Sequence, residues 1–164
     1  MAFDFVLLAA QTATVIFLTG WLTIGALENL IHPQLNSAFT AEVLDMTRMR
    51  QDYPDAYAAV AYRRVSQENV QKLLFRIIVT WELSATIGLW VGSFCLAIAL
   101  FGIVPTDLAR ALGLVGALLF TATWAGFLVV GNWFCYWFSH EGAQNTHFQM
   151  VLWGTATMIF LSVR

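Results

Sequence analysis

The stretch LLFRIIVTWELSATIGLWVGSFCLAIALFGIV, residues 73–104, decides the fold of this chain. Residues 83–101 of it include no charged side chain. A helix rises about 1.5 Å per residue, so this part alone nearly crosses a hydrocarbon core of about 30 Å. The stretch therefore predicts a transmembrane helix. Glu82 stands at its edge, where a carboxylate needs a partner from protein or water.

The composition of the whole chain indicates a membrane protein. Of its 164 residues, 59 % are hydrophobic and only 11 % are charged, whereas an average soluble domain has about 25 % charged residues. The formal net charge of −2 provides no basic face for nucleic acid. Cys95 and Cys135 lie in apolar runs, where a thiol acts as a small packing residue. We expect one all-α, polytopic membrane domain over residues 1–164.

Four apolar segments predict a bundle of four transmembrane helices. The expected spans are residues 5–31, 68–103, 108–138 and 147–163. Pro33 cannot continue the first helix. Ser66 is expected to cap the second helix, and Thr106 or Asp107 the third. The fourth segment is short, so it crosses only where the bilayer thins or neighbouring helices shield its ends.

Residues 33–66 are the one segment with the character of a soluble protein, and they predict two short amphipathic helices. Phe39, Val43 and Met46 follow helical spacing, and Pro54 suits a helix start. The charges of this segment are mixed in sign, which is typical of a solvated face. We expect these helices to lie along the membrane surface or against the bundle ends.

An even number of crossings places the two longer loops on one side of the membrane and both termini on the other. Polar residues thereby gather toward one membrane face. We expect Glu82 and Asn132 to hydrogen-bond across helices, with the carboxylate balanced by Arg76 or His147. The full predicted intramembrane cluster is Glu28, Asn29, Arg76, Glu82, Asn132 and Gln149.

Tryptophan and tyrosine concentrate where a membrane meets water. The end of the third apolar segment is rich in these residues and predicts an interfacial belt. Its expected members are Trp81, Trp133, Tyr136 and Trp137.

Several motifs resemble those of a bacterial family of predicted small integral membrane proteins of unknown function. They are Glu28-Asn29-Leu30, residues 46–50, Tyr53-Pro54-Asp55, Thr80-Trp81-Glu82, residues 131–137 and residues 144–148. The resemblance covers nearly the whole chain. It implies a multi-pass, four-span protein of the bacterial inner membrane, and it implies no assigned reaction or cofactor.

The sequence leaves two orientations of the chain in the membrane open. Most basic residues lie between positions 48 and 76, against Arg110 and Arg164 on the other side, which favours a cytoplasmic long loop. The resemblance implies the opposite, because relatives carry basic residues near the N-terminus and in the turn between the second and third spans.

The three histidines form no strong ligand site. His140 and His147 are weak candidates for a metal, because a separation of seven residues across a loop is not the spacing of a helical histidine pair. Lone interfacial histidines also argue against haem. No serine occurs in a Gly-x-Ser-x-Gly elbow. We therefore expect no enzyme, no metal and no cofactor, although contact with lipid or a quinone stays open.

The expected function is that of a non-catalytic accessory or scaffold subunit. Apolar helix faces are available for packing against lipid or against the helices of a larger membrane complex; an electron-transfer or photosynthetic complex would be a suitable host. The alternative is a small oligomeric transporter, or an ion- or proton-conducting protein, that uses Glu82. A homo-oligomer stays open in either case.

Overall fold

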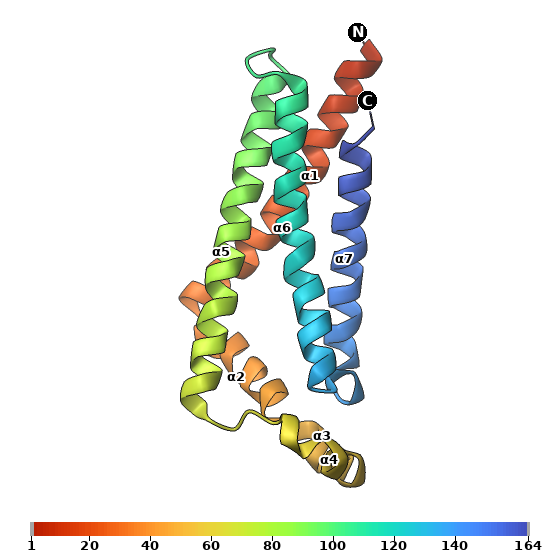
Figure 1. The fold of residues 1–164 in the computed structure, drawn as a ribbon. Helices are drawn as coiled ribbons and strands as arrows, with labels where there is room; N and C mark the ends of the chain where they lie inside the picture. The colour runs from red at the N-terminus through yellow and green to blue at the C-terminus, as the bar shows by residue number, and fades with distance from the viewer. Residues whose placement is uncertain (1, 164) are drawn as a thin grey trace.

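The computed structural model describes residues 2–163, which fold into helices without a strand (Figure 1). The long helices are α1 (Ala2–Ile31), α5 (Glu68–Ala99), α6 (Thr106–Trp133) and α7 (Glu141–Leu161). The connection from α1 to α5 contains α2 (Pro33–Leu44), α3 (Thr47–Asp52), α4 (Pro54–Val60) and the 3-10 turn η1 (Ala61–Arg63), and a second 3-10 turn, η2 (Tyr136–Phe138), precedes α7. The chain ends lie beside the α5–α6 turn, while α3 and α4 lie at the other end, called here the loop end (Figure 1).

Three helices are long and apolar enough to cross a membrane, namely α1, α5 and α6. The prediction of transmembrane helices is therefore confirmed for three of the four segments. The helix α7 has 21 residues and packs against α6. It is not among the three, because its first turns carry polar side chains such as Gln144, Asn145 and Gln149.

Several helix ends differ from the predicted ones. α1 begins at Ala2 instead of residue 5, and α7 begins at residue 141 instead of 147. α5 ends at Ala99 instead of residue 103, because the chain turns through Gly102, whose φ of 72° suits glycine. α6 ends at Trp133 instead of residue 138, because Cys135 adopts a left-handed φ of 53°.

The predicted helix caps are also wrong. Gln67 precedes α5 where Ser66 was expected, and Pro105 precedes α6 where Thr106 or Asp107 was expected. Neither Gln67 nor Pro105 forms a side-chain capping bond. The long apolar helices are therefore set by hydrophobic length more than by caps, which act only on the first turn.

The segment between α1 and α5 is helical, as predicted, but it forms three α-helices and a 3-10 turn instead of two helices. It docks on the loop end of α6. Pro33 and Pro54 each begin a helix, which agrees with the fixed φ of proline. Leu44, Met46 and Met49 are buried against Phe134 and Cys135, forming a second apolar core. This core holds the short helices beneath the bundle.

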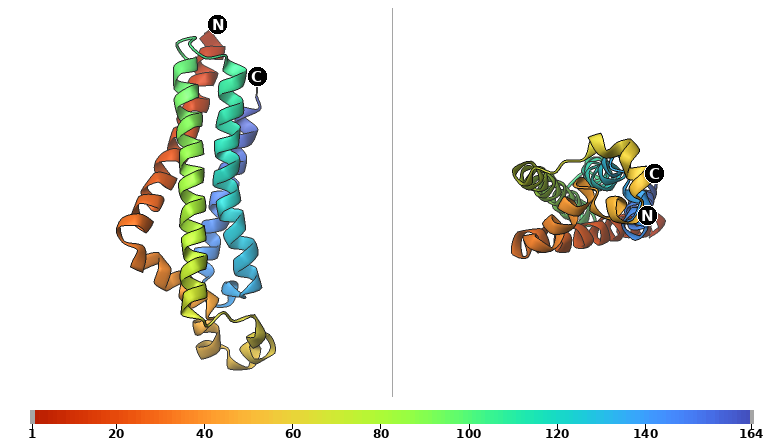
Figure 2. Two further views of the ribbon diagram at one scale, coloured as in Figure 1. Left: turned by 60° about the vertical axis from the view of Figure 1, so that its left-hand side comes forward. Right: turned by 90° about the horizontal axis from the view of Figure 1, so that it is seen from below.

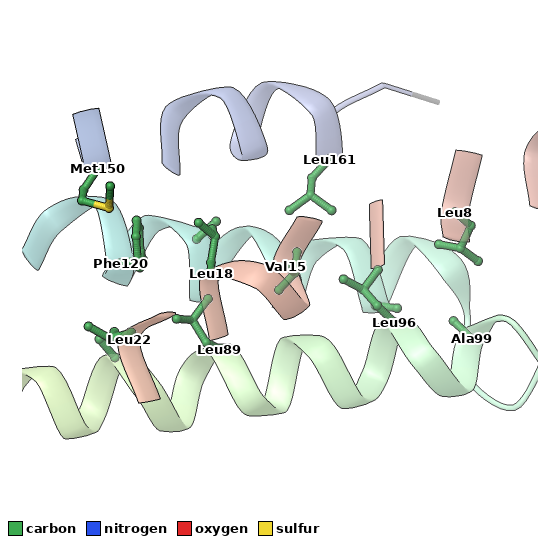
Figure 3. Close-up of a cluster of buried hydrophobic side chains, with 13 residues drawn as sticks. Leu8, Val15, Leu18, Leu22, Leu89, Leu96, Ala99, Phe120, Met150 and Leu161 are labelled. Carbon is green, nitrogen blue, oxygen red and sulfur yellow. The ribbon is translucent and has the colours of Figure 1, made fainter. Parts of the chain in front are cut away.

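The main core lies where α1, α5, α6 and α7 meet (Figure 3). Leu18, Leu89 and Phe120 are completely buried in it. α5 and α6 lie side by side in the half near their connecting turn and separate toward the loop end (Figure 1). Their backbones approach so closely that a Cβ atom on Gly92 would lie 2.9 Å from the Cα atom of Gly113. Such close contacts between small residues are typical of packed membrane helices.

The helix α1 does not follow α5 over its full length. Toward the loop end it leans away from α5, and α2 returns to the bundle at an angle (Figure 2). The reversal occurs at Pro33, directly after α1 ends. The divergence places the faces of α1, α2 and α5 around a common space near the loop end.

Candidate functional site

A cavity of about 230 Å³ lies at the loop end of the bundle, between α1, α2, α5, α6 and the start of α7. Much of its wall is apolar, including Phe75, Ile78 and Phe127. A smaller set of polar or partly polar side chains also lines it: Asn29, Asn36, Thr40, Glu82, Trp124, Tyr136 and His147. A mainly apolar cavity with a few polar groups is the usual form of a small-molecule site.

One wall carries a chain of hydrogen bonds that ends on a buried carboxylate. Asn36 Nδ2 on α2 donates to Asn29 Oδ1 on α1 over 2.7 Å. Asn29 Nδ2 in turn donates to Glu82 Oε2 on α5 over 2.6 Å. Glu82 is only 6 % exposed. The two amides therefore connect three helices, and Asn29 satisfies one oxygen of a carboxylate that would otherwise be buried alone.

A second part of the wall is a group of aromatic rings around His147. The imidazole of His147 lies 5.0 Å from the ring centre of Phe127, with 29° between the planes. It also lies 5.4 Å from the Trp124 ring and 6.2 Å from the Tyr136 ring. These rings come from α6, η2 and α7, so the wall forms only when the three segments pack together.

Three buried polar atoms of this wall lack a hydrogen-bond partner among the described residues. They are Trp124 Nε1, the Tyr136 hydroxyl oxygen and His147 Nδ1. Native proteins pair nearly all such atoms, and each unpaired one costs about 1–3 kcal/mol. Burial raises the pKa of the Tyr136 phenol, which keeps this group a neutral hydroxyl. The wall therefore contains hydrogen-bonding capacity that the protein itself does not use.

Comparison with known proteins agrees with this architecture. A family model described as "Predicted small integral membrane protein (DUF2165)" matches residues 7–164. The chain belongs to this family. No curated protein and no solved structure matches it. The DUF2165 match spans every residue that lines the cavity, so the site lies within the family's domain. As a DUF2165 member the protein is an integral membrane protein.

The DUF2165 fold brings together only part of the predicted polar cluster. Asn29 and Glu82 meet, whereas the other members are exposed: Glu28, Arg76, Asn132 and Gln149. The predicted bond between Glu82 and Asn132 is not formed, because Asn29 holds the carboxylate. Gly131 faces the interior, and the next residue on a helix is turned by about 100°, which directs Asn132 outward. Within residues 2–163, neither Arg76 nor His147 forms an ion pair with Glu82.

Three of the four predicted belt residues remain at the surface. Trp133 and Trp137 are about half exposed. Trp81 is similarly exposed, and its Nε1 donates to Thr123 Oγ1 over 3.0 Å. Tyr136 differs, because it is only 4 % exposed and belongs to the cavity wall. The left-handed conformation of Cys135 folds the Tyr136 ring onto Gly131 of α6. A Cβ atom on Gly131 would lie 2.6 Å from this ring.

His140 and His147 occupy different surroundings. His140 Nε2 lies 3.6 Å from Glu42 Oε1, and its ring contacts Phe39. Burial, with the nearby positive charge of Arg48, lowers the pKa of His140 against the opposing effect of Glu42. His147 instead belongs to the cavity wall. Within residues 2–163 no group of three or more His, Cys, Asp or Glu side chains is placed to hold a metal.

Sequence reasoning missed three residues that matter. Asn36 and Trp124 contribute to the cavity, and nothing in their local sequence distinguishes them. Gln11 did carry a signal, since it is the only amide in the apolar segment of residues 5–27. It is fully buried, and its Nε2 donates to the carbonyl oxygens of Phe160 and Val163 over 2.8 Å and 3.0 Å. Its Oε1 accepts from Arg110 Nε over 2.9 Å.

Proposed function

We propose that this protein binds a small, mainly apolar molecule in its loop-end cavity and catalyses no reaction. The observation that carries the proposal is the cavity of about 230 Å³ beside three buried polar atoms without partners. A ligand that pairs with these atoms would remove their unfavourable burial. In this proposal the polar groups orient the ligand, and none of them forms or breaks a covalent bond.

The position of the cavity supports access from the membrane. Asn36, Phe39 and Val130 line the cavity and are exposed, so its rim reaches the surface between α2 and α6. Val130 lies on a helix that is apolar enough to cross a membrane. A molecule dissolved in the bilayer can therefore reach the site near the membrane interface. We place the protein in a bacterial inner membrane, as the resemblance of its motifs implies.

The test uses a pair of glycines on α1. Gly25 lines the cavity, and a Cβ atom there would meet nothing within 4 Å. Gly25→Leu should therefore fill part of the space without displacing the backbone. Gly20→Leu is the matched control, because Gly20 also has open space but does not line the cavity. Both changes have the same effect on helix propensity.

The measurement is mass spectrometry of organic extracts from protein isolated in mild detergent. We expect the natural protein and Gly20→Leu to carry the same small molecule in near-equal ratio to protein. Gly25→Leu should retain at least about tenfold less, which corresponds to about 1.4 kcal/mol of binding free energy. Equal small-molecule content in all three proteins, or only bulk lipid in each, would contradict the proposal.

The accessory-subunit role is a second candidate. The short helices α3 and α4 project beyond the end of the bundle (Figures 1 and 2), where they offer a surface outside the long helices. A host complex could bind there while its membrane helices pack against α1, α5 or α6. Stoichiometric co-purification with other membrane subunits would support this role. Isolation of a lone homo-oligomer from the native membrane would contradict it.

Conduction through Glu82 receives less support. All lining residues of the cavity lie in the loop-end half, and beyond Glu82 the core is filled by Leu18, Leu22 and Leu89. A proton or ion path would need polar groups or water through this layer. Glu82→Gln should therefore leave any flux across vesicles unchanged. If the substitution abolishes a flux, transport through Glu82 becomes the better supported function.

A further inference from the structure

We propose that the ligand is a neutral, planar six-membered ring that carries hydrogen-bonding oxygens, the chemistry of a membrane-soluble quinone or quinol. This inference rests on the proposed binding function and names its ligand class. Four properties of the cavity lead to it: its volume, its ring-lined wall, its unused hydrogen-bonding atoms and the charges around it.

The volume sets the size of the bound group. An apolar cavity of about 150 Å³ is large enough to hold benzene. The cavity here measures about 230 Å³, which leaves room for one ring with a few substituents. A fused system much larger than two rings or a pair of acyl chains exceeds this space. A tail attached to the ring would leave through the exposed rim at Phe39 and Val130.

The wall suits a flat aromatic partner. Phe127, His147 and Tyr136 stack with interplanar angles of 29° and 22° about the imidazole. Aromatic rings prefer offset-stacked or edge-on contacts with other rings. A planar ring can therefore extend the existing stack, whereas a flexible chain would gain only non-specific contact.

The unused polar atoms define what the ring must carry. Trp124 Nε1 can only donate a hydrogen bond, and the Tyr136 hydroxyl donates or accepts. Both atoms lack a partner in the described structure. In this inference both side chains turn toward the cavity when the ligand binds, so that their polar atoms reach its oxygens. A carbonyl or hydroxyl on the ring provides the acceptor that the indole needs.

The charges around the cavity exclude an anionic headgroup. No lysine or arginine is present among its described lining residues, so a phosphate or carboxylate would enter without a counter-charge. Glu82 is the one acidic side chain of the lining, and Asn29 already donates to it. This carboxylate can accept one further bond from a hydroxyl of a quinol. A cationic ligand is the competing class, because rings beside a carboxylate also attract ammonium groups.

The test is a calorimetric titration of purified protein with each of four probes. The probes are a short-chain 1,4-benzoquinone, its quinol, butylbenzene and benzyltrimethylammonium. We expect saturable binding of the quinone or the quinol. Trp124→Phe and Tyr136→Phe should each weaken it about 2- to 12-fold, the range of one lost neutral hydrogen bond. Trp90→Phe is the matched control, because Trp90 donates to Thr23 and does not line the cavity.

The outcomes separate this inference from the proposed function. Equal binding of butylbenzene, or binding that both substitutions leave unchanged, would overturn the ring-oxygen inference. Binding of the ammonium probe alone would overturn it in favour of a cationic ligand. In those cases a native molecule lost from Gly25→Leu would still support the proposed function. If no probe binds and the two glycine variants carry the same extracted molecules, both statements fail.

Discussion

Asn29 and Glu82 join two helices that are long and apolar enough to cross a membrane. Their side-chain hydrogen bond of 2.6 Å runs from the amide of α1 to the carboxylate of α5. The bond lies in the last turn of α1, which ends at Ile31, at the end of this helix that leans away from α5 (Figure 2). It both holds the divergent end of α1 and fixes an acidic group in the wall of the cavity. One interaction thereby links the stability of the bundle to the shape of its candidate site.

Removing Asn29 should destabilise the bundle. Asn29→Leu leaves the Glu82 carboxylate buried without its donor, and we expect the free energy of unfolding to fall by about 2 kcal/mol. Asn132→Leu is the control, because Asn132 is exposed and does not contact Glu82. Reversible unfolding in mixed micelles measures both. Equal losses in the two variants would show that the bond seen here does not support the fold.

The contact between α5 and α6 depends on glycine. A Cβ atom on Gly116 would lie 3.0 Å from Leu89 Cα and 3.1 Å from the carbonyl oxygen of Gly88, both backbone atoms. Gly116→Ala must therefore separate the helices, and we expect a loss of about 1–3 kcal/mol. Gly126→Ala on the same helix meets open space and should be neutral or stabilising. The same unfolding assay compares the two variants. A Gly116→Ala protein as stable as the natural one would contradict the close approach of α5 and α6.

Gln11 should hold the end of α7. Gln11→Leu removes the donor to two backbone carbonyls and the acceptor for Arg110. We expect a loss of about 1–3 kcal/mol and faster amide exchange in the last turn of α7. Gln149→Leu, at an exposed position, is the control for replacing an amide by leucine. Unchanged exchange near Phe160 in Gln11→Leu would refute this role.

Acid should weaken the loop end through His140. Burial lowers the pKa of its imidazole in the folded state, so the unfolded chain binds more protons between the two pKa values. The stabilisation is fully present above the ordinary pKa of about 6.5 and is lost as pH falls toward the folded value. Melting temperatures measured at decreasing pH should fall, and His140→Gln should reduce that slope. If the melting temperature depends on pH equally in both proteins, groups other than His140 cause the acid destabilisation.

The sequence alone determined the class of protein and the approximate position of most helices. Hydrophobicity is a property of each segment by itself, so long apolar runs predicted α1, α5 and α6 before any packing was known. Pro33 and Pro54 likewise act locally: α1 ends before Pro33 and α4 begins at Pro54, both as predicted. Glu82 was identified as an acid in need of a partner because its place at the edge of the apolar run follows from the same count, and in the fold it is buried.

Only the tertiary structure decided which side chains meet. The partner of Glu82 depends on the rotation and register of α1 against α5, and a single position in the chain encodes neither. Tyr136 enters the cavity because one residue, Cys135, adopts a left-handed conformation, which apolar periodicity does not reveal. The cavity itself arises from the divergence of α1 and the return of α2, which are relationships between helices. Pairing and shape are therefore properties of the packed bundle, whereas insertion into the membrane follows from composition and length.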